Sequence, residues 1–349
     1  MLVRLTVAVL ALTGSVLTSL TAADKAAVNV YMYSEYIDPA VPKEFEAATG
    51  YPLVVSTYES QEEMVAKLRA GSVNQYDVVV ATDVIVTQMI KLKLVQAFDQ
   101  KKLPNAKNID PQFRKLAYDP KDEYTVPYQW GTIGILYDSA KVPAEKATWK
   151  WMFDPAQQVS PFVMMDEMRS MLGIALKYNG ASMNSRDPKQ VKAAADLLIA
   201  AKKSQKCLGF DGGVGGKDKV LKGESTAAVV YNGDAVRALT EKPGLAYAVP
   251  AEGSNIWCDN LLVTSEAPNL AGAHAFVNYV LDAKVAAQIS NFNRYATPVS
   301  AAFSQITPAD KANPAIYPDA ATMKTLEYLE DLGKDTRLVT EAWTAVKSQ

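Results

Sequence analysis

Residues 76–83, YDVVVATD, carry the clearest structural signal in this 349-residue chain. The uninterrupted valine run is typical of a strand that is buried on both faces, as in a parallel sheet covered by helices. A helical pattern follows at 84–92, and two pairs of strand and helix patterns precede the valine run. This β-α-β-α-β order predicts an α/β fold with a mainly parallel sheet.

The segments around this strand continue the alternation of strands and helices. One expected helix starts at a capping box formed by Ser60 and Glu63 and ends at Gly71. The other expected strands are 28–33, 53–56, 161–165, 226–231, 245–249 and 256–263. The other expected helices are 38–49, 168–178, 187–203, 270–281, 284–290 and 320–332. We therefore expect two α/β lobes joined by extended crossovers.

The charge balance and the single histidine exclude several classes of function. Lys and Arg number 36 against 38 Asp and Glu, so there is no basic excess to hold a nucleic-acid backbone. A lone His274 cannot build a metal site from several histidines. The glycine-rich stretch 207–216 does not continue into a phosphate-binding loop, because Asp218 replaces the Ser or Thr that holds magnesium. We expect a flexible loop at this stretch. For the protein as a whole, we expect no bound metal, no cofactor and no enzymatic activity.

The first 23 residues predict a secretory signal peptide. Arg4 gives a positive start, an apolar run extends from Leu5 to Leu20, and small residues follow at 21–23. A membrane anchor is the alternative, but the run is short for a span of roughly 20 residues and lacks a basic flank. We expect the mature chain, which starts at residue 24, to be exported.

Two cysteines, Cys207 and Cys258, are present in the chain. In an exported protein such a pair can form one disulfide, and two unpaired buried thiols are the alternative. The export signal favours the disulfide.

Aromatic and acidic residues gather at the ends of the expected strands. Ligands of open parallel α/β sheets bind beyond the carboxyl ends of the strands, so we expect these residues to converge on a cleft. Carboxylates accept the N–H donors of an alkylammonium ion, and aromatic faces attract the cation by about 0.5–2 kcal/mol per contact. The candidate carboxylates are Glu35, Glu167 and Asp259. The candidate aromatic residues are Tyr33, Tyr36, Tyr231, Trp257 and Tyr295.

Six segments together resemble the spermidine/putrescine-binding proteins of bacterial ABC importers. They are YSEY at 33–36, STYES at 56–60, YDVVV at 76–80, VPYQWG at 126–131, WCD at 257–259 and YATP at 295–298. They occur in the family's order and at similar spacing over nearly all of the mature chain. The resemblance implies the type II periplasmic binding protein fold, in which two discontinuous lobes close over a ligand. It implies lobe 1 at 24–131 plus 259–300, and lobe 2 at 132–258 plus 301–349.

The resemblance also implies roles for individual residues. Trp257 and Asp259 match the tryptophan and aspartate that hold the alkyl chain and an amine. The other positions that match ligand residues of the family are Ser34, Glu35, Tyr36, Thr82, Glu167, Tyr231 and Tyr295. The family's second acidic residue is replaced by Ser170, an aromatic residue by Val84, and a polar residue by Leu329. These replacements remove polar and charged contacts that serve a triamine.

Our main interpretation is reversible capture of a polyamine, putrescine or spermidine, in the periplasm. A monomer would close on the ligand and deliver it to an inner-membrane ABC permease. One alternative keeps the fold but binds another cationic or zwitterionic solute, such as an amino-acid derivative or an iron complex. Another is a secreted enzyme or a sensor subunit, against which the shortage of histidine and nucleophile motifs argues.

Overall fold

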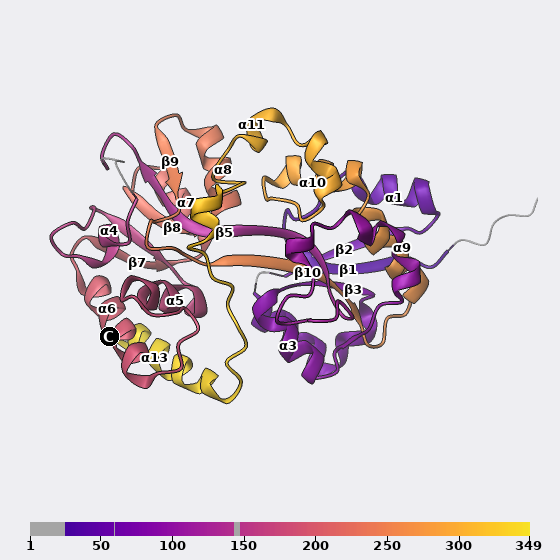
Figure 1. The fold of residues 1–349 in the computed structure, drawn as a ribbon, viewed down its shortest axis with the longest axis horizontal. Coiled ribbons are helices and arrows are strands. Elements are labelled where there is room, and N and C mark those ends of the chain that lie inside the picture. Colours follow the sequence, from indigo (N-terminus) through magenta and orange to yellow (C-terminus); the bar gives the residue numbers. More distant parts are fainter. Residues whose placement is uncertain (1–24, 59, 143–146) are drawn as a thin grey trace, which may run out of the picture.

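A continuous mixed sheet runs through the molecule and divides into two α/β lobes (Figure 1). The computed structural model describes residues 25–58, 60–142 and 147–349. The expected signal peptide at 1–23 therefore lies outside the described residues. The architecture confirms the expected two-lobed α/β fold.

The first lobe contains three parallel strands, as the alternating pattern predicts. β1 (Val28–Tyr33) lies between β2 (Leu53–Tyr58) and β3 (Val78–Thr82) and is parallel to both. Ser60 Oγ accepts a hydrogen bond from the Glu63 N–H at 3.1 Å, which confirms the capping box. The helices of this lobe are α1 (Val41–Thr49), α2 (Gln61–Lys67), α3 (Asp83–Lys91), α9 (Leu270–Val280) and α10 (Ala283–Asn293).

The second lobe repeats the parallel arrangement. β6 (Phe162–Met165) lies between β7 (Cys207–Asp211) and β8 (Ala227–Tyr231) and is parallel to both. Its helices are α4 (Lys150–Phe153), α5 (Met168–Tyr178), α6 (Pro188–Lys203), α7 (Gly213–Leu221), α8 (Asn232–Glu241) and α13 (Thr336–Ser348). The short helices α11 (Pro308–Lys311) and α12 (Ala320–Met323) precede α13 in the chain. No helix of the described chain has both the length and the apolar character needed to cross a membrane.

Two long antiparallel strands at the centre of the sheet join the lobes (Figure 1). β5 (Val126–Asp138) pairs with β10 (Ile256–Thr264) as far as Thr132. From Ile133 onward β5 pairs instead with β8 and β9, where β9 comprises Leu245–Ala248. β10 also pairs with β3 and with the short strand β4, which comprises Val95–Gln96. The resulting order is β2-β1-β3-β10-β5-β8-β6-β7.

The glycine-rich stretch is regular secondary structure, so the prediction of a loop at 207–216 was wrong. β7 ends at Asp211 and α7 begins at Gly213. A Cβ atom at Gly216 would lie 3.3 Å from the Cβ atom of Ala228, so α7 packs closely on the sheet. Glycine permits this approach, and the packing outweighs its poor helix propensity.

The region that follows α12 also differs from the prediction, because the expected helix at 320–332 ends at Met323. The Glu327 N–H donates to the carbonyl oxygen of Ser254 at 3.0 Å, and the Ile256 N–H donates to that of Glu327 at 3.1 Å. This stretch therefore pairs with the start of β10. Tertiary hydrogen bonding has replaced the local helical preference.

Cys207 and Cys258 are both free thiols, so the predicted disulfide is absent. Cys207 begins β7 at the edge of the sheet, whereas Cys258 lies in the central β10. Four strand intervals separate β7 from β10, which corresponds to about 19 Å. A disulfide requires Cα atoms within about 7 Å of each other, so the strand order prevents the bond.

Candidate functional site

Asp259 is the centre of a buried hydrogen-bond network between β3 and β10. It lies opposite Thr82 in the antiparallel pair, and only 4% of the residue is exposed. Thr82 Oγ1 donates to one carboxylate oxygen at 2.6 Å, and the Tyr36 hydroxyl donates to the other. The Tyr33 hydroxyl lies 3.3 Å from Thr82 Oγ1. Four of the predicted site residues are therefore in one cluster.

The electrostatics of this cluster favour the arrival of a cation. Burial raises the pKa of Asp259 to about 6, although hydrogen bonds from Thr82 and Tyr36 partly oppose the shift. Burial and the neighbouring Asp259 carboxylate also raise the pKa of the Tyr36 phenol well above its usual value. Among the described residues, only neutral hydroxyl groups donate to the Asp259 carboxylate. A buried carboxylate without a cationic partner is costly, and a bound ammonium group would remove that cost.

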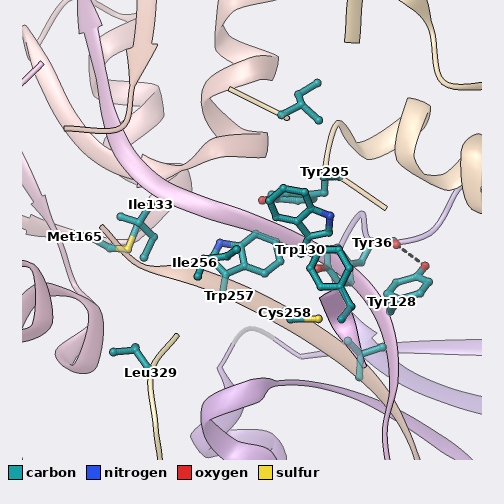
Figure 2. Packing of buried hydrophobic residues seen from close by; sticks show 14 of the residues in the cluster. Tyr36, Tyr128, Trp130, Ile133, Met165, Ile256, Trp257, Cys258, Tyr295 and Leu329 are labelled. Atoms are coloured by element: carbon teal, nitrogen blue, oxygen red, sulfur yellow. Dashed lines mark hydrogen bonds between the residues drawn. The ribbon is translucent and has the colours of Figure 1, made fainter. Parts of the chain in front are cut away.

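Five aromatic residues form a continuous surface beside this carboxylate, which we call the aromatic wall: Tyr33, Tyr36, Tyr231, Trp257 and Tyr295. Trp257 meets Tyr295 edge to face at a centroid distance of 5.2 Å and meets Tyr231 at 6.0 Å. Tyr36 is 5.8 Å from Tyr295 and 5.5 Å from Tyr33. Figure 2 shows Trp257 and Tyr295 side by side, with Tyr36 lying further along. All five predicted aromatic residues thus lie together.

Gly233 gives the aromatic wall the space that Tyr295 occupies. It lies two residues after Tyr231, in the first turn of α8, and a Cβ atom there would overlap the ring of Tyr295. We expect Gly233→Ala to displace that ring and to lower the free energy of unfolding by about 1–3 kcal/mol, because overpacking strains a dense core. Thermal and denaturant unfolding would measure the loss.

Gly212→Ala is the matched control, because no atom of the described chain, apart from Gly212 and the residues on either side of it, lies within 4 Å of the Cβ position at Gly212. Its φ of −61° is also accessible to alanine. An equal loss of stability in both glycine variants would contradict the proposed packing of Tyr295.

The loop between Tyr33 and Tyr36 is exposed, unlike the buried cluster around Asp259. Ser34 and Glu35 are exposed, and Glu35 has a positive φ of 55°. The turn brings the flanking rings of Tyr33 and Tyr36 together edge to face. The Glu35 carboxylate also acts on α8, where burial raises the pKa of Asp234 and the charge of Glu35 adds to the shift. The Glu35 charge is therefore felt by α8 of the second lobe.

Glu167 is the N-cap of α5. Its carboxylate oxygens accept the N–H groups of Ser170 at 2.6 Å and Arg169 at 3.4 Å. After burial, the Glu167 charge is the largest contribution to the raised pKa of Tyr231. Glu167 thus lies near the aromatic wall from the second lobe while its oxygens stabilise a helix end.

The three positions that depart from the family pattern differ in their surroundings. Ser170 is buried, and its hydroxyl donates to Asn255 Oδ1 at 3.3 Å. Leu329 is 6% exposed and packs in the hydrophobic core that also contains Trp257. Val84 is half-buried at the start of α3.

One acidic residue near Asp259, Asp83, was not among the candidate carboxylates of the sequence analysis. Asp83 begins α3, is 2% exposed, and accepts the N–H groups of Val84 at 2.7 Å and Cys258 at 3.3 Å. Burial raises its pKa well above the usual value, and the Asp259 carboxylate contributes to the shift. Its position directly after Thr82 was the available signal. Within the part of the chain that the structure describes, no group of three or more His, Cys, Asp or Glu is placed to hold a metal ion.

The chain is similar in sequence to known bacterial binding proteins. Residues 40–344 match the family described as bacterial extracellular solute-binding protein. The chain is 30% identical over 328 residues to a spermidine/putrescine-binding periplasmic protein of Salmonella typhimurium, covering 94% of this chain and 93% of the relative. It is 33% identical to a putrescine/agmatine-binding protein of Pseudomonas aeruginosa, covering 97% of this chain and 99% of the relative.

Solved structures show the same architecture. The spermidine/putrescine ABC transporter substrate-binding protein of Streptococcus pneumoniae aligns with a TM-score of 0.83 at 28% identity. The alignment covers 93% of this chain and 99% of that protein. A putative spermidine/putrescine ABC transporter protein of Listeria monocytogenes aligns with a TM-score of 0.81 at 30% identity. The similarity therefore extends over both lobes.

Proposed function

Because the chain belongs to the bacterial extracellular solute-binding proteins, we propose that it captures a polyamine, putrescine or spermidine, for an ABC importer. As a member of that family it is a transport protein and not an enzyme. The observation that carries the proposal is the buried Asp259 carboxylate, which accepts only from neutral hydroxyl groups within the described residues and lies beside the aromatic wall. One ammonium group binds at Asp259, and the methylene chain lies against Trp257 and Tyr295.

The proposed binding residues are those predicted from the sequence: Tyr33, Ser34, Glu35, Tyr36, Thr82, Glu167, Tyr231, Trp257, Asp259 and Tyr295. Tyr33, Tyr36 and Thr82 support the carboxylate through hydroxyl groups. Glu35 and Glu167 bring negative charge to the rim and to the second lobe, where a second ammonium group binds. The site thus suits an alkyl chain with a cation at each end.

The lobes are proposed to divide at 131/132, 258/259 and 300/301, so that each is discontinuous in sequence. The pairing of β5 supports the first division, because it changes partner from β10 to β8 and β9 between Thr132 and Ile133. A small change of backbone angle at these crossing strands moves one lobe relative to the other. Closure then buries the ligand at Asp259.

The protein is proposed to act as a monomer in the periplasm and to deliver its ligand to an inner-membrane permease. The relative from Salmonella typhimurium is a periplasmic protein, and the one from Streptococcus pneumoniae belongs to an ABC transporter. The expected signal peptide at 1–23 supports the same location. Cleavage at residue 23 would appear in the intact mass of the exported protein.

Native mass spectrometry of the purified protein tests the ligand directly, because a tightly held amine remains bound on purification. Calorimetric titration with putrescine, spermidine and an uncharged diol of equal length then measures affinity and the need for charge. We expect at least one of the two amines to bind, and we expect no binding of the diol. Binding of amino-acid derivatives or iron complexes in place of any polyamine would refute the proposal.

Affinity for putrescine is expected to fall as the pH drops below about 6. The cation binds the ionised Asp259, and the pKa of this carboxyl is about 6 in the free protein, so protonation competes with the ligand. Both amines stay protonated in this range, since alkylammonium groups have pKa values of about 10. Calorimetry should give about tenfold weaker binding at pH 5 than at pH 8.

Thermal unfolding at each pH provides the control for this experiment, because it shows that the protein remains folded over the range. A dissociation constant that stays unchanged between pH 8 and pH 5 would contradict the role of Asp259 as the buried partner of the cation.

A further inference from the structure

We infer that Asn293, the last residue of α10, is a positioning residue that holds Tyr36 and Tyr295 in the arrangement that binds the ligand. The inference rests on the proposed function of the same site. Asn293 is 1% exposed and lies two residues before Tyr295, but it belongs to no motif that the sequence displays. Its effect on the ligand is exerted through the two tyrosines.

The side chain of Asn293 connects three separate segments. Its Oδ1 accepts the backbone N–H of Tyr295 at 3.2 Å. Its Nδ2 donates to Gln129 Oε1 at 2.9 Å and to the backbone oxygen of Tyr36 at 3.4 Å. Gln129 lies on β5 directly opposite Asp259 on β10. One amide therefore ties two members of the aromatic wall to the strand beside the carboxylate.

The chemistry of the contacts requires an amide at this position. The Tyr295 N–H is a donor and needs an acceptor, whereas the oxygens of Tyr36 and Gln129 need a donor. Alanine satisfies neither requirement, and a carboxylate would place its second oxygen against two acceptors. Because the groups are buried, water cannot easily replace the lost bonds.

Both tyrosines have further backbone anchors, which allow the fold to survive the loss of Asn293. The Tyr128 hydroxyl donates to the Tyr36 oxygen at 2.9 Å (Figure 2). The Ser290 hydroxyl donates to the Tyr295 oxygen at 2.5 Å. Asn293→Ala should therefore loosen the aromatic wall without unfolding the lobe.

Asn291→Ala is the matched control on the same helix. Asn291 makes two side-chain hydrogen bonds, against three for Asn293. One runs from its Nδ2 to the Gln305 oxygen at 3.2 Å, and the other runs from the Thr307 N–H to its Oδ1 at 3.1 Å. These bonds join α10 to the chain that follows it and touch no residue of the aromatic wall. The two variants thus remove similar numbers of bonds from one helix.

Calorimetric titration with putrescine and spermidine should show about tenfold weaker binding for Asn293→Ala, and binding within about twofold of wild type for Asn291→Ala. Near-ultraviolet circular dichroism of the free proteins, which reports aromatic packing, should change for Asn293→Ala alone. Thermal unfolding confirms that both variants are folded at the temperature of measurement.

The outcomes separate this inference from the proposed function. Wild-type protein that binds neither amine refutes the proposed function, and the circular dichroism comparison then still decides whether Asn293 positions the wall. Wild-type binding together with equal affinities and equal spectra for the two asparagine variants overturns the inference alone.

Discussion

Asp259→Asn is expected to bind putrescine about 100- to 1,000-fold more weakly than wild type, because it leaves a buried ammonium group without its counter-charge. Asparagine keeps the size of the side chain and an oxygen that can accept from Thr82 Oγ1, which lies 2.6 Å from the carboxylate. The substitution therefore isolates charge from shape. Isothermal titration calorimetry at pH 7.5 measures the effect.

The stability of Asp259→Asn, unlike its affinity, should not fall. Burial raises the pKa of Asp259, so the ionised carboxylate destabilises the free protein, and a neutral amide should unfold at the same temperature or higher. Loss of affinity without loss of stability is the signature of a binding carboxylate. Wild-type affinity in Asp259→Asn would defeat the assignment of the site.

Asp119→Asn is a suitable control. Asp119 is 4% exposed and accepts three backbone N–H groups and a hydroxyl from the following residues Glu123, Tyr124 and Thr125. Its role is local, so this variant should lose stability and keep its affinity. Asp119 and Asp259 are equally buried. Asp119→Asn is predicted to lose stability and keep its affinity, whereas Asp259→Asn is predicted to lose affinity and keep its stability.

Trp257→Ala is expected to weaken putrescine binding about 100-fold, because the indole supplies both apolar contact and an aromatic face for the cation. Trp257 is also the residue that Tyr231 and Tyr295 both meet edge to face, so its removal leaves these rings without a common neighbour. Calorimetry is preferable to fluorescence, since the substitution removes an emitting group.

Trp343→Ala controls for the loss of a large aromatic side chain. Trp343 lies on α13 and packs against Phe210 of β7 at 5.2 Å, far along the sheet from β10. Its removal should lower stability and leave affinity unchanged. If both tryptophan variants bound putrescine like wild type, the aromatic wall would have no part in recognition.

Most of the strands and helices could be predicted from the sequence, as α5 illustrates. Its predicted bounds, 168–178, match the observed helix Met168–Tyr178, because an apolar face and a capping residue are encoded within a few neighbouring residues. The failures came where distant contacts override local preference. The α7 glycines tolerate a helix because β8 lies against it, and residues after Met323 are extended because they pair with the start of β10.

The residues that gather around Asp259 were also largely visible in the sequence, whereas their hydrogen bonds and burial were not. Tyrosines and acids at strand ends indicate a cation-binding cleft, since sheet topology brings such ends together. The sequence identified Glu35 and Asp259 equally as candidate carboxylates. In the structure Glu35 is exposed, whereas Asp259 is buried among hydroxyl groups. Asn293 could not be identified from the sequence, because two of its three hydrogen-bond partners, Tyr36 and Gln129, lie on distant segments.

The sequence alone determined an α/β chain whose strands end in aromatic and acidic residues, because periodicity and capping depend on neighbours only a few positions apart. The tertiary structure decided which of those residues meet. Thr82 and Asp259 are 177 positions apart and become partners only through the register of β3 against β10. That register, together with burial, turns an ordinary aspartate into a carboxylate with a pKa of about 6 that is suited to receive a cation.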